Sequence, residues 1–144
     1  MPFIINQNRY SIFDRTIESN GLKDTAARLH KGIITFSPLA QGLLTDRYLH
    51  GIPADSRVHT DGRFLKETDL TPEKLAKIRA LNEMAAARGQ TLAEMALAWL
   101  LSHEEITTVL IGASKTQQIL DNIKAVQNTS FTAEELAEID RISK

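Results

Sequence analysis

Three groups of residues in this chain carry side chains that could bind a ligand. They are residues 6–10 (NQNRY), 36–42 (FSPLAQG) and 112–115 (GASK). Each group follows a short apolar run of the kind that forms a buried strand. Because parallel α/β folds bind ligands at the carboxyl ends of their strands, the sequence places all three groups where a ligand would bind.

The third group has residues suited to an anion. Gly112 permits close approach of the backbone, and Ser114 is expected to cap a helix whose free N–H groups and positive dipole end attract negative charge. Lys115 adds a full positive charge. The pattern predicts a phosphate site, but an ordinary capped helix after a strand would carry the same residues.

The other candidates also have two interpretations each. The ring of Phe36 could stack on a heteroaromatic ligand or belong to the core. Gln7 could bond a carboxamide or satisfy the end of its strand. Arg47 and Arg57 lie in a long loop, where their guanidinium groups could grip a phosphate or stay solvated.

Metal and nucleophile chemistry finds no support in the residue types. The chain has 0 Cys, which excludes disulfides, thiolate metal sites and a cysteine nucleophile. Its four histidines lack metal-ligand spacing: His30, His50, His59 and His103. No Ser/His/Asp arrangement or Gly-x-Ser-x-Gly motif is present. We therefore expect no metal site and no catalytic nucleophile.

The elements that must position these groups alternate along the chain. Strands are expected over 3–5, 33–36 and 108–111, with helices over 22–31 and after start signals at 71–73, 91–94, 114–117 and 131–135. A long connection, residues 40–71, separates the second strand from the next helix. This alternation predicts an α/β fold of parallel βα units with right-handed crossovers.

Composition narrows the class of protein further. The 144 residues include 17 Lys+Arg and 18 Asp+Glu, so the net charge is −1, which argues against nucleic-acid binding. No apolar run approaches the roughly 18 residues of a membrane span. The first residues do not form a signal peptide, so we expect a cytoplasmic protein that uses neither a membrane nor a nucleic acid.

The number of strands is small for the fold that the pattern suggests. A three-stranded parallel sheet has two unpaired edges, which favour association. A complete (β/α)8 barrel takes about 250 residues. We therefore expect the chain to be a portion of a larger fold, and to form a homo-oligomer or associate through its exposed sheet edges.

Motifs along the whole chain, residues 1–144, resemble the C-terminal part of the aldo-keto reductase family. The matching segments lie at 5–10, 36–45, 51–57, 95–100, 109–114 and 118–122. They are most similar to the bacterial branch related to the voltage-gated potassium channel β-subunits. The resemblance implies a TIM (β/α)8 barrel, of which this chain supplies strands six to eight. It also implies an NADPH cofactor and the reduction of a small aldehyde or ketone.

The resemblance implies contacts along the entire cofactor. At the nicotinamide end, Gln7 would bond the carboxamide and Phe36 would stack on the ring. The implied pyrophosphate contacts are Ser37, Leu39 and Gln41, and Arg47 and Arg57 match positions where this branch has basic residues along the cofactor. The implied contacts of the adenosine ribose and its 2′-phosphate are Gly112, Ser114, Lys115 and Gln118, and those of the adenine are Asp121 and Asn122.

Departures from the family pattern leave two functions open. The family's catalytic Asp, Tyr, Lys and His lie on the first half of the barrel, and no segment here matches their motifs; Tyr10 matches a later strand. Arg47 replaces what is often Lys, and Asp55 sits where a relative can carry Tyr. The chain resembles either the cofactor-holding part of a reductase, or a non-catalytic nucleotide-binding module or potassium-channel-β-like partner protein.

Overall fold

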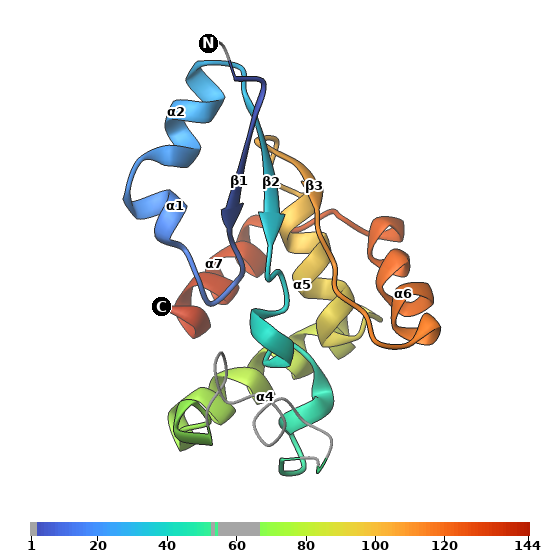
Figure 1. Cartoon of the computed structure of the whole chain (residues 1–144). Helices are drawn as coiled ribbons and strands as arrows, with labels where there is room; N and C mark the ends of the chain where they lie inside the picture. Colours follow the sequence, from blue (N-terminus) through green and yellow to red (C-terminus); the bar gives the residue numbers. More distant parts are fainter. Residues whose placement is uncertain (1–2, 53, 55–66) are drawn as a thin grey trace.

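The computed structural model of the chain describes residues 3–52, 54 and 67–144 and confirms the predicted order of elements (Figure 1). In chain order these are β1 (Ile5–Arg9), α1 (Thr16–Ser19), α2 (Leu22–Arg28), β2 (Gly32–Phe36), η1 (Ala40–Gly42), η2 (Asp46–Tyr48), η3 (Glu67–Asp69), α4 (Pro72–Ala87), α5 (Leu92–Leu101), β3 (Ile106–Val109), α6 (Thr116–Asn122), η4 (Ile123–Gln127) and α7 (Ala133–Ser143). Within these residues, no helix is long and apolar enough to cross a membrane.

The three strands form the predicted parallel sheet in the order β1-β2-β3. Both outer strands are displaced from their predicted ranges. β1 contains the polar residues that we expected beyond its end, because its ladder to β2 pairs every residue from Ile5 to Arg9. β3 starts at Ile106, two residues before the predicted position, and ends at Val109. Short strands with polar residues in them escape detection by apolar runs alone.

The end of α2 also differs from the expectation. A lysine followed by Gly32 predicted the helix stop there, but α2 ends at Arg28 and His30 takes the left-handed conformation, with a φ of 51°. Gly32 is instead the first residue of β2. A Cβ atom at this position would lie 2.2 Å from the Thr107 side-chain oxygen, so any larger residue here would force Thr107 in β3 to move.

The two faces of the sheet differ in their cover. Alternation along the strands puts Ile33, Thr35 and Ile106 on one face, where all three are buried. Figure 1 shows the helices beside and behind the strands, and α5 contacts β3. The opposite face, which we call the open face, carries Ile5 and Arg9, and both are exposed. The layered helices therefore complete only one side of the sheet.

Helix α5 is the centre of the covered side. Its start is a capping box in which Thr91 accepts from the Glu94 amide and Glu94 accepts from the Thr91 amide, as predicted. Trp99 is 1% exposed, and its ring lies 5.2 Å from the ring of Tyr10 and 4.4 Å from that of His103. The expected deep packing of this nearly all-apolar helix is confirmed.

The helix after β3 packs differently from the prediction. Helical spacing counted from the start signal at 114–117 predicts that Ile123 faces the sheet, but Ile123 is 53% exposed, while Asn122 and Ala125 are buried. At Ile123 the α-helix α6 gives way to the 3₁₀-helix η4. The tighter winding of a 3₁₀-helix changes which residues share a face, so helical spacing counted straight through this point fails.

Candidate cofactor site

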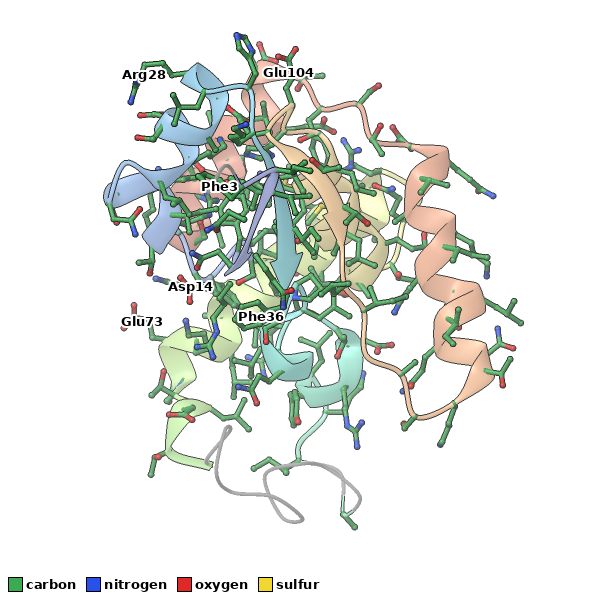
Figure 2. The ribbon with its side chains drawn as sticks, turned by 45° about the horizontal axis from the view of Figure 1, so that its top comes forward. Phe3, Asp14, Arg28, Phe36, Glu73 and Glu104 are labelled. Carbon is green, nitrogen blue, oxygen red and sulfur yellow. The ribbon has the colours of Figure 1, made fainter. Side chains whose placement is uncertain are left out.

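The three residue groups lie at or near the carboxyl ends of the strands, although most of the first group belongs to β1 itself. Because β1, β2 and β3 are parallel, the chain leaves each of them at the same end, which is the lower end in Figure 1. Figure 2 shows Phe36 at this end, far from Arg28 and Glu104 at the other. These residues therefore lie at the end of the sheet where a ligand site was expected.

The nicotinamide candidates lie on the open face. Gln7 is exposed and pairs with Ile34 in the ladder, two residue pairs before the pair formed by Arg9 and Phe36. The sequence had indicated that Gln7 follows the end of its strand, but Gln7 lies within β1. Phe36 is the half-buried last residue of β2, and the alternation along the strand puts it on the open face with Ile34.

The turn after β2 holds an unusual backbone. Ser37, Ala40 and Gln41 have φ values of 53°, 47° and 61°, a region that residues other than glycine seldom adopt. Such conformations cost about 1–3 kcal/mol each and cluster at ligand sites. Hydrogen bonds within the turn hold it, including Gly42 N–H to the Leu39 carbonyl at 2.9 Å. The sequence contained no signal for this strain.

The same turn contains a buried polar atom. Among the described residues, Gln41 Oε1 is buried without a hydrogen-bond partner. A buried acceptor of this kind costs free energy unless a ligand or water satisfies it. Leu39, the third predicted contact in this turn, is half-buried and packs against the core. The turn thus combines strain with an acceptor that a donor could satisfy.

Of the two loop arginines, one can be placed. Arg47 is a half-buried residue of η2, the short helix that Thr45 caps by accepting from the Arg47 amide at 3.2 Å. The Thr45 hydroxyl also donates to the Gly42 carbonyl at 2.6 Å, which ties this helix to the strained turn. Arg57 lies outside the described residues.

The cap of α6 is not the one predicted. Lys115, not Ser114, is the N-cap residue. Gln118 Oε1 accepts from the Ser114 amide at 2.8 Å, the Lys115 amide at 3.2 Å and the Ser114 hydroxyl at 3.3 Å. The Gln118 side chain reaches back from the helix to both main-chain N–H groups, and the Ser114 hydroxyl donates to the same Gln118 oxygen. Gln118 therefore organises this turn, which leaves Gly112 and Lys115 exposed.

The two predicted adenine contacts have different accessibility. Asp121 accepts from Lys124 Nζ at 2.9 Å and from Gln117 Nε2 at 3.0 Å, and these bonds hold the pKa of its carboxyl below the usual range. Asn122 is 9% exposed. A ligand at this helix would meet Asp121 more readily than Asn122.

The whole chain matches one protein family. The family model described as "Aldo/keto reductase family" matches residues 1–144. The chain belongs to this family. An L-glyceraldehyde 3-phosphate reductase of Escherichia coli O157:H7 is 48% identical over 144 residues, which cover 98% of this chain and 42% of that protein. The "Probable voltage-gated potassium channel subunit beta" of Oryza sativa subsp. japonica is 35% identical over 125 residues, covering 85% and 38%.

Solved structures of the aldo/keto reductase family show the same arrangement. An aldo-keto reductase of Bacillus halodurans in its holo form has a TM-score of 0.71 at 26% identity, over 99% of this chain and 43% of that one. A thermostable aldo-keto reductase in complex with epalrestat has a TM-score of 0.69 at 23% identity, covering 98% and 40%. The chain thus spans about two fifths of the relatives that it matches.

Membership of this family explains the open face of the sheet. The matched neighbours are TIM barrels, and the three-stranded parallel sheet is consistent with part of such a barrel. In a barrel the helices cover the outside of the strands and the other face points inward. The expected fold class is therefore confirmed, as a partial barrel.

Neither tyrosine of the chain offers its hydroxyl to the open face. The chain has 2 Tyr. Tyr10 is 0% exposed and its hydroxyl bonds Glu18; burial, together with that bond, raises the pKa of the phenol. Tyr48 is 3% exposed. Both side chains belong to the core.

Proposed function

We propose that this chain holds NADPH as the cofactor-binding portion of an aldo-keto reductase, with β1, β2 and β3 in the positions of barrel strands six, seven and eight. The observation that carries the proposal is the strained turn after β2, where three residues other than glycine have positive φ beside Phe36. A reduced nicotinamide would supply a hydride to the carbonyl carbon of an aldehyde or ketone, whose oxygen takes a proton to give the alcohol.

The residues of the chain then have distinct binding tasks. Phe36 offers a ring face for the nicotinamide, and Gln7 on the same open face offers an amide for the carboxamide. The turn 37–41 presents backbone groups and the Gln41 side chain to the pyrophosphate. Lys115 is exposed beside the Gln118-ordered turn, where it suits the 2′-phosphate.

A comparison of nucleotide affinities tests this assignment. Because Lys115 adds positive charge where the 2′-phosphate would lie, NADPH should bind more tightly than NADH in a fluorescence titration. Lys115→Ala should narrow the difference. The matched control is Lys144→Ala, which removes an exposed lysine from the end of α7 and should leave it unchanged. Equal affinities of the unmodified chain for the two nucleotides would refute the proposal.

We also propose that the chain by itself has no carbonyl reductase activity, because both of its tyrosines are buried. Loss of a general acid typically lowers a rate about 10²–10⁴-fold. A steady-state assay with NADPH and 4-nitrobenzaldehyde should therefore detect no turnover. Rates within the ordinary enzyme range of about 1–10³ s⁻¹ would contradict this.

The buried tyrosines also favour a second candidate, a non-catalytic nucleotide-binding module or a partner protein similar to a potassium channel β-subunit. The two candidates differ in what happens when a separate polypeptide supplies the family's catalytic segment. A reductase portion should gain NADPH-dependent activity on mixing, whereas a binding module should bind nucleotide and remain inactive.

We further propose that the chain associates through its open face and strand edges, as a homo-oligomer. Ile4 is 84% exposed, Leu110 45% and Ile5 37%, and Ile34 between them is half-buried. Burying a few hundred Å² of apolar surface at about 25 cal/mol per Å² supplies several kcal/mol. Light scattering behind a sizing column should show a mass above 16.0 kDa at tens of micromolar; a folded monomer would refute this.

A further inference from the structure

We infer that Arg9 selects substrates that carry an anionic group, a phosphate or a carboxylate, in addition to the carbonyl. The inference rests on the proposed function, because it concerns the same site. It starts from a feature that the three residue groups did not reveal separately: the guanidinium Cζ of Arg9 lies 5.7 Å from the centre of the Phe36 ring.

The sheet itself fixes this neighbourhood. Arg9 and Phe36 are ladder partners and the last residues of their strands. The ladder extends one residue further, since the Tyr10 amide donates to the Phe36 carbonyl at 3.4 Å. The Arg9 amide also donates to Asn8 Oδ1 at 2.9 Å. Because Gln7 and Arg9 are two residues apart in one strand, both belong to the open face.

The charge of Arg9 is available for a ligand. Arg15, Arg88 and Arg141 each pair with a glutamate. Arg9 is exposed, and in the part of the chain that the structure describes no carboxylate lies within ion-pair distance of it. Asp14, the acidic residue that follows Arg9 most closely in the chain, accepts from the amide and hydroxyl of Thr16.

The position of Arg9 favours the substrate over the cofactor as its ligand. If Phe36 and Gln7 hold the nicotinamide, the carbonyl that accepts the hydride must lie over the open face beside that ring. Arg9 borders the same space at the mouth of the barrel. Its planar guanidinium suits two parallel bonds to a phosphate or carboxylate. Because a guanidinium does not release its proton, Arg9 orients the substrate and takes no part in proton transfer.

The test measures binding of a product-like probe to the chain saturated with NADP⁺. Glycerol 3-phosphate carries the anion, and glycerol is the neutral match. We expect glycerol 3-phosphate to bind at least about tenfold more tightly in isothermal titration. Arg9→Gln should abolish this preference and leave the affinity for NADPH unchanged. Arg9→Lys, which keeps the charge but loses the forked geometry, should retain part of it.

A matched control and three outcomes decide the question. Arg28→Gln replaces another exposed arginine, on α2 at the opposite end of the sheet, and should keep the full preference (Figure 2). An Arg9→Gln protein that still prefers glycerol 3-phosphate overturns the inference. So does one that loses affinity for NADPH, because Arg9 would then serve the cofactor. A wild-type chain that binds no NADPH overturns the proposed function, and this inference with it.

Discussion

The two faces of the same three-stranded sheet differ in exposure and in the role that we assign to them. On the covered face Ile33 and Thr35 are 0% exposed and lie beneath the helices. On the open face Gln7 and Arg9 are exposed, and Phe36 ends the row. The residues that stabilise the fold and the residues proposed to bind ligand thus point in opposite directions from one backbone. Truncating buried side chains of the covered face should therefore mainly lower stability, and truncating exposed side chains of the open face should mainly change binding.

The arginines show the same contrast. Arg15 lies 4.1 Å from the centre of the Trp99 ring and pairs with Glu18 at 3.2 Å and Asp140 at 3.1 Å, which joins α1, α5 and α7. Such a guanidinium is fully occupied by the fold. Arg9, on the open face, has an aromatic neighbour but no carboxylate among the described residues. The difference separates a structural arginine from one available to a ligand.

The largest expected effect is on the covered side. Trp99→Ala should lower the free energy of unfolding by about 3–5 kcal/mol, because it leaves a cavity among Tyr10, His103 and Arg15. Urea denaturation followed by circular dichroism measures this. Tryptophan fluorescence is unsuitable, because the substitution removes the only tryptophan of the chain. Ile4→Ala, at an 84% exposed position just before β1, should change the value by less than about 0.5 kcal/mol. Similar losses for both would erase the contrast between the faces.

A smaller effect should follow from adding one atom to the open face. Gly32→Ala would bring a Cβ within 2.2 Å of Thr107 Oγ1 and should cost about 1–3 kcal/mol of unfolding free energy. Thr107→Ala in the same chain removes that oxygen and should recover most of the loss. A double-mutant cycle from thermal unfolding tests the coupling, and strictly additive effects would show that the two residues do not meet.

The strained turn should respond in the opposite direction. Gln41→Gly permits the φ of 61° without strain and removes a buried acceptor, so the free energy of unfolding should rise by about 0.5–1 kcal/mol. Affinity for NADPH should fall, because the turn loses its imposed shape. Gln127→Gly, in a 3₁₀-helix without a positive φ, is the control and should lower stability. Greater stability with undiminished NADPH binding would separate the strain from the site.

The smallest expected effect is a pH dependence on the covered side. Burial holds the pKa of His103 below its ordinary value, with Lys23 acting in the same direction and Glu18 and Glu105 opposing it. The unfolded chain therefore binds more protons just below pH 6.5, so stability should fall as the pH falls from about 6.5 towards the folded-state pKa. In His103→Gln this part of the slope should disappear from urea midpoints measured between pH 5 and 7. An unchanged slope would exclude His103 as its source.

Local signals in the sequence were enough to define the order of the elements and several of their boundaries. Thr71, Thr91 and Thr132 were recognised as helix starts, and each accepts from a main-chain amide as expected. These signals work because a cap involves residues three apart, whatever the rest of the chain does. The resemblance to a family then indicated the barrel and the candidate site residues, whose cofactor contacts stay predictions.

Only the tertiary structure showed which residues far apart in the sequence are in contact. Whether Gly32 ends a helix or makes room for Thr107 depends on the neighbouring strand, and so does the meeting of Arg9 with Phe36. The positive φ values of 37–41 depend on the packing around the turn, and no residue in it signals them. Sequence by itself determines which elements form, because their signals are local. Which side chains share a site follows from strand register, and that exists only once the sheet is assembled.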